Sequence, residues 1–177
     1  DSDKFSPINS YSNDQKIVIG WTGTFSSKIY LDLLRGVFQN LAKRYDFNLR
    51  IIGNFQYDLP GVDLEVIQWT SEREVKDLQG IDIGVYPLTN NKWVLGKSGL
   101  KAIQYMAFGI PTVATNVGTT SKIINHKING WLVKTEDEWT EALEILIKDS
   151  DLRRKIGENA RETVLENYSK NVIKFQY

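Results

Sequence analysis

Cysteine is absent from the 177-residue sequence, and histidine occurs once, as His126. Without cysteine the chain forms no disulfide, no cysteine–zinc site and no cysteine nucleophile. A single histidine disfavours both a two-histidine metal site and a Ser-His-Asp triad. His126 lies in the polar stretch HKING, which is typical of a surface position. Composition therefore excludes or disfavours the common metal and nucleophile chemistries.

An excess of charge of one sign is also missing, because 22 lysines and arginines balance 22 aspartates and glutamates. Proteins whose main ligand is DNA or RNA usually carry a basic excess, so no nucleic-acid partner is expected. No apolar run approaches the ~20 residues that a membrane-spanning helix needs. The N-terminal stretch DSDKFSPINS has no apolar region of a signal peptide. These features predict, by default, a cytoplasmic location.

The length fits one domain, and strand and helix patterns alternate along it. Residues 1–15 are polar and are expected to be a linker or tail, with the domain spanning 16–177. Short β-branched runs predict strands, whereas apolar residues at helical spacing and capping motifs predict helices. The expected strands are 16–21, 49–53, 64–69, 81–86, 111–115 and 131–134, and the expected helices are 28–45, a short one at Ser71-Glu72-Arg73-Glu74, 100–108, 120–126, 135–148 and 151–167.

This alternation predicts an α/β fold, a three-layer Rossmann-like parallel sheet with helices on both faces. In such folds ligands bind at the C-terminal ends of the strands, near the point where the strand order reverses. The loops after the first, fourth and fifth strands are therefore the candidate site. They contain glycines and small or basic polar residues, namely Gly20, Gly23, Thr24, Gly96, Lys97, Ser98, Gly99 and Gly118.

The stretch Gly96-Lys97-Ser98-Gly99-Leu100 precedes an expected helix and is a candidate phosphate-binding turn. Glycines let the backbone approach a phosphate, and the N–H groups of the first helical turn point at it. The alternative is a flexible loop with an ordinary helix N-cap. The turn GWTGT after the first strand lacks the G-x-G-x-x-G spacing, and the second strand ends in Gly53-Asn54 without an acidic residue. NAD binding is therefore disfavoured.

The five tryptophans raise the question of stacking on carbohydrate. Trp21, Trp69 and Trp131 lie in strand patterns, and Trp139 lies in a helix pattern. Core positions are expected for these four. Trp93 lies in a polar loop beside the candidate site, where it would cover a ligand or anchor the loop.

The stretch GKSGLKAIQYMAFGIPTVATNVGTTSKIINHKINGWLV, Gly96 to Val133, resembles the signature of family 4 glycosyltransferases of the GT-B fold. The family pattern is EGFGLxxLEAMAxGxPVVATxxGGxxEIIxxGxNGxLV. The resemblance extends back through IDIGVYPL and forward to the helix that ends near NYS. DSDKFSP resembles the linker that joins the two halves of such enzymes, so nearly the whole chain is covered.

The resemblance implies that this chain is the C-terminal, donor-binding domain of a glycosyltransferase, with an N-terminal acceptor domain in the same protein. The family transfers a sugar from a nucleoside diphosphate to a glycan or lipid-linked acceptor, usually with retention at the anomeric carbon and without a bound metal. A nucleotide sugar is thus the expected substrate, no cofactor is expected, and the N-terminal half would provide any peripheral membrane association. The fragment by itself would be inactive.

The resemblance also assigns candidate binding residues. Gly23 and Thr24 match the Gly-Arg turn after the first strand, and Gln104 takes the place of the family's second glutamate, which accepts hydrogen bonds from the ribose. The backbone of Gly99 and Leu100 matches the turn that meets the diphosphate. Beside these, Lys97 and Ser98 would lie at the diphosphate and sugar, and Trp69 and Thr70 at the base.

Three charged groups of the family pattern are missing, because its first glutamate falls on Gly96, its arginine on Thr24 and its lysine near Ile29. The basic groups normally offset the charge of the leaving diphosphate. Lys97 and Lys28 are the candidates for a catalytic substitute, with Lys101 as a further cation.

The same departures motivate an alternative hypothesis, a non-catalytic GT-B-like module that binds a nucleotide or a partner. A receiver-type signalling domain is disfavoured, because Trp21-Thr22 supplies no acidic pair after the first strand.

Overall fold

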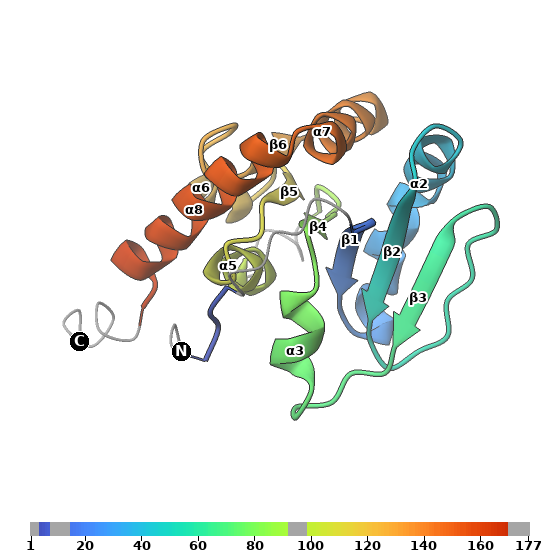
Figure 1. The fold of residues 1–177 in the computed structure, drawn as a ribbon, viewed down its shortest axis with the longest axis horizontal. Coiled ribbons are helices and arrows are strands. Elements are labelled where there is room, and N and C mark those ends of the chain that lie inside the picture. Colours follow the sequence, from blue (N-terminus) through green and yellow to red (C-terminus); the bar gives the residue numbers. More distant parts are fainter. Residues whose placement is uncertain (1–3, 8–14, 92–98, 170–177) are drawn as a thin grey trace.

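The computed structural model describes residues 4–7, 15–91 and 99–169, which form one parallel sheet with helices on both faces (Figure 1). The strand order is β3-β2-β1-β4-β5-β6, and every pairing between neighbours is parallel. This confirms the predicted three-layer Rossmann-like α/β fold. The strands are β1 (Ile17–Thr22), β2 (Phe47–Ile52), β3 (Asp63–Ile67), β4 (Ile83–Tyr86), β5 (Thr112–Thr115) and β6 (Trp131–Val133).

Helical segments lie in the connections between consecutive strands, except between β2 and β3, and α7 and α8 follow β6. Helix α8, orange to red in Figure 1, runs alongside α5 and follows α7. The helical segments are η1 (Phe25–Ser27), α1 (Lys28–Leu31), η2 (Asp32–Leu34), α2 (Arg35–Ala42), α3 (Glu74–Gln79), α5 (Leu100–Ala107), α6 (Thr120–Ile123), α7 (Glu136–Lys148) and α8 (Ser150–Asn167).

Alternate residues along each strand point to opposite faces of the sheet and are buried there. On β4, Ile83 and Val85 pack with α2 and α7 in the larger core, whereas Tyr86 packs with α5, α6 and α8. On β5, Val113 and Ala114 divide between the two faces in the same way. Both faces of a parallel sheet are covered in this fold class, which explains the continuous apolar runs of its central strands.

Tyr105 fastens α5 to the centre of the sheet. Its ring is fully buried over Gly84 of β4, where a Cβ atom would come within 2.8 Å of two ring carbons. Its hydroxyl oxygen accepts a hydrogen bond of 2.9 Å from the N–H of Thr22, the last residue of β1. Burial raises the pKa of this phenol. Helix α5 is therefore held at a fixed position relative to the end of β1 and to β4.

Two helix termini confirm local expectations from the sequence. Thr135 and Glu138 form the predicted capping box of α7, in which the Thr135 hydroxyl accepts from the Glu138 N–H at 3.2 Å. Gly109 follows α5 with a positive φ of 69°, the conformation that a glycine at this position was expected to adopt. Helix α8 begins with Asp149 as its N-cap.

Three other local expectations are wrong. The single helix expected over 28–45 is divided at η2, where hydrogen bonding tightens to a 3-10 turn. The strand expected over 64–69 ends at Ile67, so Trp69 is 40% exposed and is not a core residue. The expected capping box at Ser71 does not form, because the Thr70 hydroxyl accepts from the Arg73 N–H and α3 begins only at Glu74.

The described part of the N-terminal segment, residues 4–7, packs against the domain. The Phe5 ring meets the Phe108 ring edge to face, with 5.3 Å between centroids. Its carbonyl oxygen accepts from Arg161 of α8, and the Ser6 carbonyl oxygen accepts from Gln79 of α3 at 2.7 Å. The assignment of 1–15 to a linker stays a prediction, but part of this segment is docked across α3, α5 and α8.

Tyr105→Phe tests the link between α5 and the sheet. The substitution keeps the ring and removes only the acceptor for the Thr22 N–H. We expect a loss of about 1 kcal/mol in the free energy of unfolding, measured by urea denaturation. Tyr45→Phe is a comparison variant, which removes a half-buried hydroxyl that donates to Glu144 and makes no contact with α5. Equal stability of Tyr105→Phe and the wild-type chain would contradict the anchoring role.

Candidate functional site

The strand order reverses between β1 and β4, because the chain builds outwards from β1 to β3 and then returns to the other side of β1. In open α/β sheets, ligand-binding crevices lie at the carboxyl ends of the two strands beside such a point. Here those ends are Thr22 of β1 and Tyr86 of β4. The turn after β1 and the start of α5 meet at this edge.

The turn after β1 is closely packed at Gly23. Its N–H donates to the Ile52 carbonyl oxygen at 3.0 Å, and an added Cβ would come within 2.2 Å of the Trp21 ring. The Ser27 hydroxyl accepts from the Thr24 N–H and donates to the Thr24 carbonyl oxygen, both at 3.0 Å. The turn is therefore closely packed on its inner side, and Thr24 is exposed on its outer side.

The start of α5 also requires glycine. Gly99 has a positive φ of 68°, and a Cβ there would lie 2.5 Å from Cδ1 of Ile123. The first helical hydrogen bond runs from the Ile103 N–H to the Gly99 carbonyl oxygen, so the preceding N–H groups of the first turn are directed out of the helix. Leu100 is 66% exposed there. Of the other predicted residues in this loop, Lys97 and Ser98 lie outside the described residues, as do Trp93 and Gly96.

Lys101 brings a positive charge between the two glycine turns. Its Nζ lies 3.4 Å from the Ser27 Oγ and 4.9 Å from the centroid of a Trp21 ring. Lys28, by contrast, forms an ion pair of 2.8 Å with Asp32 and lies 5.2 Å from the Tyr57 ring centroid. Of these two described candidates, Lys101 is the cation that joins the turn after β1 to α5.

A second group of predicted residues meets at Glu74, the first residue of α3. Oε1 of Glu74 accepts hydrogen bonds from Nε2 of Gln104 at 3.2 Å and from Nε1 of Trp69 at 3.4 Å. Lys4 Nζ lies 3.8 Å from the other carboxylate oxygen. Sequence reasoning missed Glu74, because its spacing from Ser71 fits a capping box. Its position in the chain could have indicated it, because Glu74 is an acidic residue in the segment that follows the third strand.

A cavity of about 340 Å³ adjoins this carboxylate. Glu74 and Gln104 supply its polar groups, and apolar side chains from α5, α8 and the N-terminal segment supply the rest. Leu100 and Gln104, both predicted to bind substrate, therefore line one cavity. The remaining lining residues are Phe5, Ile103, Ala107, Val164 and Tyr168.

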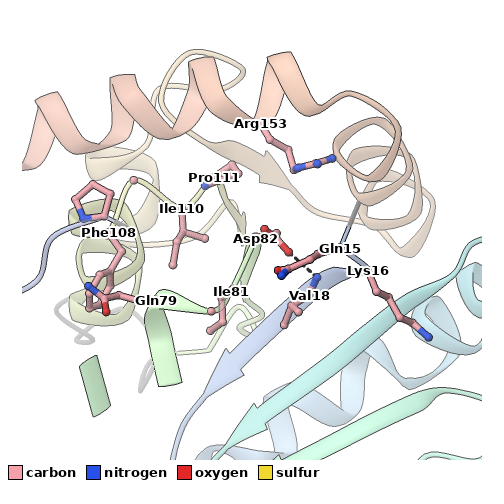
Figure 2. A pocket seen from close by; sticks show the side chains of 13 residues that line it. Gln15, Lys16, Val18, Gln79, Ile81, Asp82, Phe108, Ile110, Pro111 and Arg153 are labelled. Carbon is pink, nitrogen blue, oxygen red and sulfur yellow. Dashed lines mark hydrogen bonds between the residues drawn. The ribbon is translucent and has the colours of Figure 1, made fainter. Parts of the chain in front are cut away.

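A different cavity, of about 260 Å³, lies at the opposite edge of the sheet, beside the N-terminal ends of β1, β4 and β5 (Figure 2). Asp82 Oδ2 accepts from the Val18 N–H at 2.8 Å, and burial raises the pKa of this carboxyl above its ordinary value of 3.8. Arg153 lines the same cavity and donates to the Leu146 and Ile147 carbonyl oxygens. Asp82 thus joins the segment before β4 to β1, Arg153 joins α8 to the end of α7, and both lie away from the predicted site residues.

Within 4–7, 15–91 and 99–169, no group of three His, Asp or Glu side chains is arranged to hold a metal ion. None of the described helices is long and apolar enough to cross a bilayer.

Comparison with known proteins decides the family. The model of the family "Glycosyl transferases group 1" matches residues 3–163. The chain belongs to the group 1 glycosyltransferases. Among curated members, the N-acetyl-alpha-D-glucosaminyl L-malate synthase of Bacillus anthracis is 37% identical over 81 residues, which cover 45% of this chain and 21% of that protein. This group 1 chain thus matches only about a fifth of that relative's length.

Solved structures agree on the fold of this group 1 domain. The C-terminal domain of LpcC, a group 1 glycosyltransferase from Francisella tularensis, is 22% identical, with a TM-score of 0.76 over 96% of this chain and 98% of that one. Anabaena HepE, solved in complex with UDP-glucose, is 14% identical, with a TM-score of 0.70 over 99% of this chain and 53% of its own. The chain has the fold of a GT-B C-terminal domain, whereas the more specific assignment to family 4 stays a prediction.

Asp82 gives the group 1 domain a testable pH dependence. Because its folded-state pKa is raised, the folded state binds more protons than the unfolded state above pH 3.8. Its contribution to stability therefore falls as pH rises from that value through the folded-state pKa. Asp82→Asn removes this titration while its amide oxygen still accepts from Val18. We expect urea denaturation between about pH 4 and 7 to show a steeper loss in the wild type. Parallel pH profiles would contradict this.

Proposed function

We propose that this chain is the donor-binding half of a glycosyltransferase, which binds a nucleoside-diphosphate sugar for transfer to a glycan or lipid-linked acceptor. The observation that carries the proposal is the contact of Lys101, two residues after the Gly99 turn, with Ser27 of the turn after β1, at the strand-order reversal. Two glycine turns, the N-terminus of α5 and one cation form a site suited to a diphosphate. The UDP-glucose bound by HepE, a protein of the same fold, supports this ligand class.

In this proposal the diphosphate lies between the Gly23–Thr24 turn and the first N–H groups of α5. Lys101 supplies the positive charge that an arginine supplies in the family pattern. Thr24 stands at the position of that arginine, and its hydroxyl lies 2.9 Å from the Ser26 hydroxyl. Lys97 and Ser98 would add to the same end of the site. Gln104 contacts the ribose, and Trp69 and Thr70 lie beside the base. Neither a metal nor a cofactor is needed for this binding.

The acceptor would bind to a second, N-terminal half of the same protein. Phe25 and Ile29, in the segments that follow β1, are 74% and 64% exposed, and Leu100 beside them in the site is 66% exposed. Apolar side chains gathered at a binding edge fit a surface that another domain covers. Sugar transfer with retention at the anomeric carbon would occur between the halves, and the N-terminal half would provide any contact with a membrane surface. The chain by itself is therefore expected to lack transferase activity.

Nucleotide binding tests the proposal directly. The chain is titrated with UDP, GDP and ADP, followed by ligand-observed saturation-transfer NMR and calorimetry. We expect one of them to bind, and Lys101→Ala to weaken that binding by about tenfold, the loss expected for one charge-assisted hydrogen bond. Lys101→Arg should retain most of the affinity, because the charge is kept.

Lys43→Ala is the matched control, because Lys43 is exposed and follows α2 at the opposite edge of the sheet. Its affinity should equal that of the wild type. Absence of binding by any of the three nucleotides at millimolar concentration would contradict donor binding. Binding that is unchanged in Lys101→Ala would instead favour a module whose nucleotide contacts do not include this cation, as expected for a non-catalytic relative.

A further inference from the structure

The contact between Glu74 and Gln104 determines which way the Gln104 amide faces. An amide side chain has a donating nitrogen and an accepting oxygen, which exchange places when the group turns over. An ionised carboxylate only accepts hydrogen bonds. The amide nitrogen of Gln104 therefore faces Glu74, at 3.2 Å from Oε1, because the reverse orientation would set two oxygens against each other.

Glu74 is itself fixed in place. The Trp69 indole N–H donates to the same carboxylate oxygen at 3.4 Å, and Lys4 lies 3.8 Å from the other oxygen. The side chain of Glu74 is 21% exposed, and it comes from the first turn of α3, whereas Gln104 comes from the second turn of α5. Once the nitrogen is committed to this carboxylate, the group that Gln104 offers to a ligand is its carbonyl oxygen, an acceptor.

We propose that Glu74 is a positioning residue that makes Gln104 an acceptor for a ribose hydroxyl of the nucleotide. This inference rests on the function proposed above. The ribose hydroxyl donates to Gln104 Oε1, while the negative charge lies on Glu74, the hydrogen-bond partner of Gln104. The pair thereby takes the role of the glutamate that the family pattern has at position 104. The negative charge lies on α3 instead of α5.

Both side chains line the 340 Å³ cavity beside α5, which places the pair where a ligand can reach it. Leu100 lines the same cavity one helical turn before Gln104, at the end of α5 assigned to the diphosphate. A ribose next to a diphosphate at the helix start would therefore meet Gln104 on the same side of α5. The arrangement predicts selectivity for ribonucleotides over deoxyribonucleotides.

The test is the ratio of affinities for the nucleoside diphosphate that binds best and for its 2′-deoxy and 3′-deoxy forms, measured by calorimetry on the full 177-residue chain. In the wild type we expect one of the deoxy forms to bind roughly five- to tenfold more weakly, the effect of one lost hydrogen bond. Glu74→Gln should lower this ratio, because the Gln104 amide can then turn over and its oxygen is no longer held toward the ribose hydroxyl.

A reciprocal exchange provides the rescue. Gln104→Glu alone should bind poorly, because it sets two carboxylates in contact, where like charges repel. Glu74→Gln combined with Gln104→Glu restores one carboxylate and one amide and should restore the ratio. Glu72→Gln, at an exposed position on the preceding turn, is the control and should leave the ratio unchanged.

The outcomes separate this inference from the proposed function. Lys101→Ala should weaken the ribo and deoxy forms equally and leave their ratio as in the wild type. Nucleotide binding with a ratio that Glu74→Gln does not alter would overturn the positioning role while the proposed function stands. Complete absence of nucleotide binding would overturn both. A lower melting temperature of Glu74→Gln with an unchanged ratio would assign Glu74 a structural role only.

Discussion

The Tyr105 hydroxyl accepts the N–H of Thr22 at the end of β1, while its ring lies on the bare backbone of Gly84 in β4. Helix α5 thus contacts both central strands at the point where the strand order reverses. The positions of Gly99 at the N-cap of this helix and of Lys101 in its first turn follow from this contact. The proposed donor contacts of α5 all depend on this contact of Tyr105.

Charge at the site is distributed over two helices. Lys101 of α5 lies against Ser27 and Trp21, at the end assigned to a diphosphate, whereas Glu74 of α3 gathers Trp69 and Gln104. The family pattern places these functions on other positions of the chain. Because neighbouring elements of the fold meet at one edge of the sheet, a charged group can be supplied from a different element without altering the fold.

The two edges of the sheet serve different purposes. At the carboxyl ends of the strands, glycine turns, exposed apolar side chains and a cation surround the candidate site. At the amino ends, Asp82 accepts a hydrogen bond from Val18 of β1, and Arg153 donates hydrogen bonds to carbonyl groups in the last turn of α7. The second set joins elements of the scaffold, and the raised pKa of Asp82 follows from that burial. Acidic and basic groups buried in a cavity do not by themselves mark a ligand site.

The sequence by itself determined the parallel α/β sheet, the capping box at Thr135 and the glycine after α5, because strand and helix periodicity and helix termini depend on residues only a few positions apart. It also placed the glycine turns at the carboxyl ends of the strands. Only the tertiary structure decided that Glu74 contacts Gln104, that Lys101 reaches Ser27, and that Trp69 is exposed. The first two contacts join residues 30 and 74 positions apart. Sheet order and helix packing bring such residues together, and no local pattern in the sequence records either.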